Sequence, residues 1–198
     1  MHSKSGAVKE EKMKTSLLLT LLAACALIGG ANFAFRGTGT HKLPSYGKLP
    51  AIELRDDKKA QFAADDLMGR ITLLQFFFTS CHGPCPLAVS QFAKLTRDLG
   101  ESNQQLQFLS VTVDPERDTP AVLAEFRTRL GLDARNWRFL TGTPEAIKEL
   151  AAACKVAADK EIHSTKVILI DPERSIRGYY DLNEPEQMTK LQADLGEI

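Results

Sequence analysis

The order of apolar and polar positions after residue 48 alternates between strand-like runs and helix-like runs. Residues 71–78 are nearly all apolar and β-prone, which is typical of a central strand buried on both faces. Residues 106–113 are expected to form the next strand. Between these two runs, apolar residues recur near the helical period, which predicts a helix over about residues 85–99. Strands that alternate with helices predict an α/β domain.

Two threonine-proline pairs predict the starts of two further helices. In Thr119-Pro120 and Thr143-Pro144, the threonine is suited to cap free backbone N–H groups and the proline to occupy the first helical position. We therefore expect helices over about residues 119–130 and 143–156. The other expected elements are a strand pair at 51–54 and 60–63, a strand at 137–140, a hairpin of 166–171 with 175–180, and a helix at 184–195.

A long uncharged segment precedes this domain. Residues 15–35 carry no formal charge, are rich in Leu and Ala, and follow four lysines. About 20 apolar residues are needed to cross a bilayer. Three interpretations remain open: an uncleaved anchor, a lipoprotein signal with lipid on Cys25, and a cleaved signal. We expect an anchor or lipoprotein signal in residues 1–36, a linker in 37–48 and the folded domain in 49–198.

All three interpretations place the domain on the far side of a membrane from the cytoplasm, because N-terminal lysines favour the cytoplasmic side. In a bacterium this means the inner membrane, with the domain facing the periplasm or the cell exterior. Cysteines there tend to be oxidised, so thiols that bind metal need a reductant. The chain has 25 basic and 25 acidic residues and no basic stripe, so we do not expect nucleic acid as a partner.

Two cysteines directly follow the first apolar run. Cys81 and Cys85 are separated by three residues and lie at the predicted start of a helix, where a thiolate is stabilised. Residues four apart share one face of a helix, so the pair can close a disulfide or bind a soft metal such as Cu(I) or Zn. His163 precedes a predicted strand and is the candidate third ligand. His82 is a weaker candidate, and Cys154 is expected to be an inert buried thiol.

Three local strings make the chain similar to the Sco/SenC family over about residues 49–195. They are FFTSC (77–81) with Cys85-Pro86, SVTVDPERDTP (110–120), and His163-Ser164 ahead of a strand that ends in Asp171-Pro172. Members of this family are membrane-tethered thioredoxin-like proteins that help assemble the copper site of cytochrome c oxidase. Many carry Pro-Asp after the first cysteine and Asp before the histidine, where this chain has His82-Gly83 and Ile162.

The resemblance implies a thioredoxin-like fold, with a central mixed sheet flanked by helices. It implies copper, as Cu(I) or Cu(II), on Cys81, Cys85 and His163. The implied partners are the copper-binding subunit of cytochrome c oxidase and a thioredoxin-like reductant or another copper chaperone. The alternative function is a membrane-tethered thiol-disulfide oxidoreductase, in which Cys81 attacks a partner disulfide and Cys85 resolves it. A peroxidase ranks third.

Overall fold

The computed structural model describes residues 43–81, 85–100, 105–131, 136–156 and 165–198. Residues 43–198 belong to one compact unit. Its elements in chain order are β1 (Glu53–Asp56), β2 (Gln61–Ala63), the 3-10 helix η1 (Ala64–Leu67), β3 (Ile71–Phe77), α2 (Cys85–Gly100), β4 (Leu106–Thr112), α3 (Pro120–Arg129), β5 (Trp137–Thr141), α4 (Pro144–Ala153), β6 (Lys166–Ile170), β7 (Ile176–Asp181) and α5 (Pro185–Leu195).

The strands form a mixed sheet in the order β2-β1-β5-β4-β3-β6-β7. The inner strands β3, β4 and β5 are parallel to one another, and the outer pairings are antiparallel. Every residue of β3 and β4 is buried, which for β3 confirms the predicted burial on both faces. Because β3 and β4 are parallel, the loops that follow them leave the sheet at the same edge.

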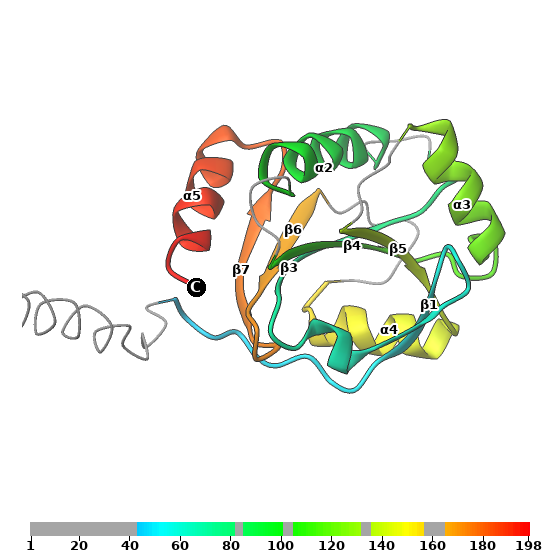
Figure 1. Ribbon diagram of the computed structural model, residues 1–198, viewed down its shortest axis with the longest axis horizontal. Helices are drawn as coiled ribbons and strands as arrows, with labels where there is room; N and C mark the ends of the chain where they lie inside the picture. Colours follow the sequence, from blue (N-terminus) through cyan, green and yellow to red (C-terminus); the bar gives the residue numbers. More distant parts are fainter. Residues whose placement is uncertain (1–42, 82–84, 101–104, 132–135, 157–164) are drawn as a thin grey trace, which may run out of the picture. The chain divides into compact units, whose positions relative to one another are not determined.

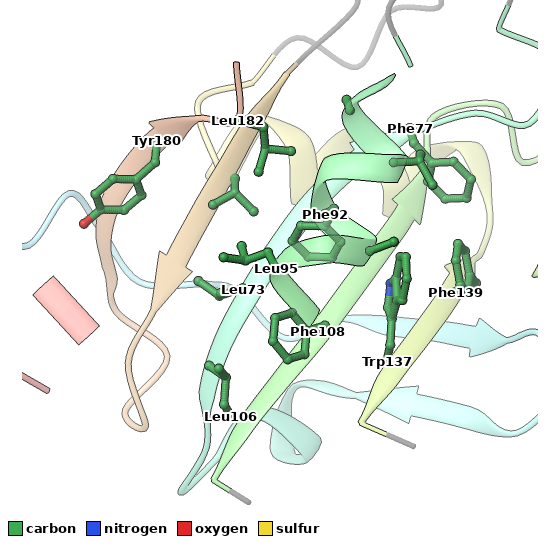
Figure 2. Close-up of a cluster of buried hydrophobic side chains, with 14 of the residues drawn as sticks. Leu73, Phe77, Phe92, Leu95, Leu106, Phe108, Trp137, Phe139, Tyr180 and Leu182 are labelled. Carbon is green, nitrogen blue, oxygen red and sulfur yellow. The ribbon is translucent and has the colours of Figure 1, made fainter. Parts of the chain in front are cut away.

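Two apolar clusters cover the two faces of this sheet. Side chains alternate along a strand, so neighbours such as Leu73 and Leu74 belong to different clusters. The first cluster packs beneath α2, α3 and α5 and includes Phe92 stacked edge-on against Trp137 and Phe108, as Figure 2 shows. The second cluster includes residues of α4 and η1. Figure 1 shows α2 and α3 on one side of the sheet and α4 on the other.

The prediction of a central mixed sheet with flanking helices is confirmed. Most boundaries lie within one residue of expectation. β1 begins and ends two residues later than predicted, and α4 ends at Ala153, three residues earlier. The helix ends there because Lys155 has a left-handed backbone conformation, with φ of 53°. The short helix η1 was not predicted.

None of the helices in the described part of the chain has the length and apolar character needed to span a bilayer. The segment predicted to act as an anchor or signal lies outside the described residues.

Candidate metal and thiol site

The cysteine pair lies at the junction between the central strand and the first long helix. β3 ends at Phe77, the chain then reaches Cys81, and α2 begins at Cys85. Pro86 occupies the first turn of α2, where the missing N–H of proline has no helical partner to lose. Cys81 is buried, with 8% of its surface exposed. The predicted helix start is therefore confirmed at Cys85, and Cys81 precedes the helix by four positions.

The carboxylate of Asp118 fixes the loop that leads to Cys81. The Thr79 backbone N–H donates to Oδ2 of Asp118 at 3.0 Å, and the Thr79 hydroxyl donates to Oδ1 at 2.5 Å. A third donor, the Thr112 hydroxyl at the end of β4, reaches Oδ2 at 2.6 Å. Asp118 and Thr112 are fully buried. One carboxylate thus joins the end of β4 to Thr79, which lies in the loop after β3 and two residues before Cys81.

The loop that carries Asp118 is itself held by backbone hydrogen bonds. The N–H groups of Arg117 and Asp118 donate to the carbonyl oxygen of Asp114, at 3.1 and 2.8 Å. The Asp114 N–H donates to the Thr112 hydroxyl at 3.0 Å. Thr119 then caps α3, accepting from the Val122 N–H at 3.4 Å, as the sequence predicted. The carboxylate of Asp118 is thereby held in one place.

The sequence did not predict that Thr79 and Thr112 bind the carboxylate of Asp118. The available signal was the polar residue Thr112 at the end of a predicted buried strand. A buried hydroxyl there needs a hydrogen-bond partner, and the nearby acidic residues offered one.

A cavity of about 380 Å³ lies beside Cys81, lined by α2 and α3. Its lining near the thiol comes from Phe78 and Thr79, and its sides from apolar residues such as Val89 and Phe126. Cys81 thus has an apolar surface next to it on which a second molecule can lie.

The remaining predicted ligands are not placed by the structure. His163 and His82 lie outside the described residues, and the side chain of Cys85 is not described either. Among the residues that are described, no three His, Cys, Asp or Glu side chains are grouped so as to hold a metal ion. The ligand set of Cys81, Cys85 and His163 therefore stays a prediction.

Cys154 is buried, as expected, and belongs to the apolar cluster on the α4 face. It follows α4 as its C-cap residue. Burial raises the pKa of the Cys154 thiol to about 12. The thiol is therefore neutral at physiological pH and unsuited to nucleophilic or metal chemistry.

The family model described as SCO1/SenC matches residues 48–195. The chain belongs to the SCO1/SenC family. This confirms the resemblance based on the three strings, and it covers the whole described sheet. The chain is similar to a protein of Stutzerimonas stutzeri that is named for copper binding. The two are 31% identical over 91% of this chain and 93% of the relative.

Two solved structures of the SCO1/SenC family show the same fold. The SCO1/SenC family lipoprotein of Bacillus anthracis is 27% identical, with a TM-score of 0.68 over 77% of this chain and 95% of the other. Yeast Sco1 with copper bound is 25% identical, with a TM-score of 0.62 over 76% of this chain and 94% of the other.

Proposed function

We propose that this SCO1/SenC protein binds copper through Cys81, Cys85 and His163 and serves in building the copper site of cytochrome c oxidase. The observation that carries the proposal is the position of the pair: Cys81 is buried at the end of the central strand, and Cys85 is the first residue of α2. The family relatives named for copper binding or solved with copper support copper as the metal.

The donor set fits Cu(I). Thiolates and imidazole are the soft and intermediate ligands that Cu(I) prefers. The N-terminus of α2 stabilises negative charge on thiolates at the first helical turn. Copper is the cargo of such a site. It is transferred to the client when ligands of the client replace the ligands of this chain. The client in this proposal is the copper-binding subunit of the oxidase.

We also propose that residues 1–36 tether the domain to the bacterial inner membrane, by a spanning helix or by lipid on Cys25. Residues 37–48 form the linker, and the copper-binding domain of residues 49–198 faces the periplasm or the cell exterior. The description of the B. anthracis relative as a lipoprotein supports a tether. In this oxidising compartment a thioredoxin-like reductant, or another copper chaperone, supplies the domain with reduced thiols or with copper.

Titration of Cu(I) into the reduced full-length chain, against a chromophoric Cu(I) chelator, tests the ligand set. His163→Ala should weaken binding about tenfold or more, and Cys81→Ser should abolish binding at one equivalent. His41→Ala is the matched control, because it removes an imidazole outside the proposed site. Equal affinities for the wild type and His163→Ala would remove His163 from the site.

The second candidate is a thiol-disulfide oxidoreductase, favoured by the same pair at a helix start. The Cys81 thiolate attacks a client disulfide and releases one client thiolate. Cys85 then displaces the second client thiolate and leaves a Cys81–Cys85 disulfide, which the external reductant reopens. This function needs no imidazole ligand, so it predicts that His163→Ala reduces client disulfides at the wild-type rate.

A further inference from the structure

The cavity beside Cys81 continues as a groove between two helices. Val89 and Ala93 of α2 lie four residues apart, so they face the groove from successive turns. Phe126 of α3 lines the opposite side. Leu130, at the end of α3, lines the groove with 45% of its surface exposed. The groove is therefore an apolar surface that begins at the thiol site.

Two arginines line the same groove in the last turns of the helices. Arg97 belongs to the last turn of α2 and Arg129 to that of α3, and both are exposed. The guanidinium of Arg129 lies over the ring of Phe126, 5.5 Å from its centroid, so the charge sits directly beside the apolar surface. Of the described residues that line the groove, none is acidic. The groove thus combines an apolar surface with positive charge.

We propose that this groove binds an extended segment of the thiol-bearing client, with an apolar side chain against Phe126 and a carboxylate at Arg97 and Arg129. This proposal rests on the proposed function, because the client brings its own cysteines to Cys81. Arginine pairs with carboxylates through parallel hydrogen bonds, which fixes the direction of the segment as well as its affinity.

Helix geometry sets the spacing within the client. Arg97 is twelve residues beyond Cys85, so it lies about 18 Å along the axis of α2 at about 1.5 Å per residue. An extended peptide advances about 3.3 Å per residue. The carboxylate of the client is therefore about five or six residues from its cysteines. An acidic residue much closer to the cysteines does not reach the arginines.

Fluorescence anisotropy with the reduced, copper-free full-length chain tests the groove without any redox step. The probe is a fluorescein-labelled peptide with serine in place of the client cysteine, a leucine midway, and a glutamate about five residues beyond the serine. A second peptide has lysine in place of glutamate. The wild type is expected to bind the glutamate peptide about tenfold more tightly than the lysine peptide, and the difference should shrink at high salt.

Three variants separate the groove from general electrostatics. The double variant Arg97→Glu/Arg129→Glu is expected to reverse the preference between the two peptides. Ser90→Trp fills the groove from an exposed position on α2 and should weaken the binding of both peptides. The matched control is Arg70→Glu, which reverses an exposed charge at the opposite end of β3 and should leave binding unchanged.

Equal affinity of the wild type for both peptides would overturn the proposal, as would retained preference in the double variant. If the groove is covered by a second copy of the chain, sedimentation will show a dimer that the double variant dissociates, and the proposal fails. Copper affinity distinguishes this failure from that of the proposed function. The double variant should bind Cu(I) as the wild type does, whereas a chain that binds the peptide but no copper would refute only the copper site.

Discussion

Replacing Asp118 by alanine removes the acceptor of three hydrogen bonds that hold the loop before Cys81. Two of these donors belong to Thr79 and the third to Thr112, whose hydroxyl is fully buried. A buried donor left without a partner costs about 1–3 kcal/mol, and the two Thr79 donors, which are partly buried, lie at the lower end of this range. The sum is reduced because burying the carboxylate itself carries a desolvation cost, which alanine removes. We expect the free energy of unfolding to fall by about 3–5 kcal/mol.

Asp118→Asn should be milder for a geometric reason. The amide oxygen can stay at the Oδ2 position, where it accepts from the Thr79 N–H and the Thr112 hydroxyl. The amide nitrogen then lies at the Oδ1 position, where the Thr79 hydroxyl can turn and accept from it. All three hydrogen bonds survive but lose the charged acceptor, so we expect a loss of about 1–2 kcal/mol.

Urea unfolding followed by tryptophan fluorescence measures both variants. The chain has a single tryptophan, and Trp137 is buried in the cluster beneath α2 and α3, so its emission reports on the core. The rate at which iodoacetamide alkylates Cys81 should rise in Asp118→Ala, because its loop is no longer held. Asp98→Ala is the control, since it removes a half-exposed carboxylate paired with Lys94 and should cost less than about 0.5 kcal/mol. A loss below about 1 kcal/mol in Asp118→Ala, or equal losses in both Asp118 variants, would refute this reasoning.

Two further predictions concern buried groups away from the thiol site. The pKa of Cys154 is raised by burial from 9.0 to about 12, so the folded chain keeps a proton that the unfolded chain releases above pH 9. Stability should therefore fall between about pH 9 and 12, and urea unfolding at pH 8 and pH 10 should show a smaller fall in Cys154→Ala; identical falls would contradict the burial effect. A Cβ added at Gly178 would lie 2.2 Å from the hydroxyl oxygen of Tyr180, which is buried and donates to Asp194. Gly178→Ala should cost about 1–3 kcal/mol in the same assay, with partial relief in Gly178→Ala/Tyr180→Phe, and a neutral effect would show that the ring moves freely.

Local sequence signals predicted the elements that depend on local chemistry. The mostly apolar run of β3 indicates burial on both faces, and Thr119 and Thr143 cap the two helices that their sequence context indicated. The end of α4 could not be predicted in this way, because it depends on the left-handed conformation of Lys155.

The details of the site depend on residues far apart in the chain. Asp118 meets Thr79 across 39 positions, so neither local sequence indicates their hydrogen bonds. The groove depends on the packing of α3 beside α2, which brings Arg97 and Arg129 to one surface. Cys81 and Cys85, by contrast, lie between two consecutive elements, and the apolar run before them and the helical periodicity after them predicted this position.

Asp118 and the N-cap of α3 are neighbours in sequence, since Thr119 follows Asp118 directly. The loop before Cys81 and the helix α3, which lines the groove, are therefore both fixed by the adjacent residues Asp118 and Thr119. If binding on one side of this pair of residues changes the affinity on the other side, thermodynamic reciprocity requires an equal effect in the reverse direction. If copper on the thiols changes the affinity of the groove for a peptide, the bound peptide changes the affinity for copper by the same factor. The affinity for copper and the affinity for the client peptide would then be linked, and a measurement of one with and without the other ligand would give the coupling free energy.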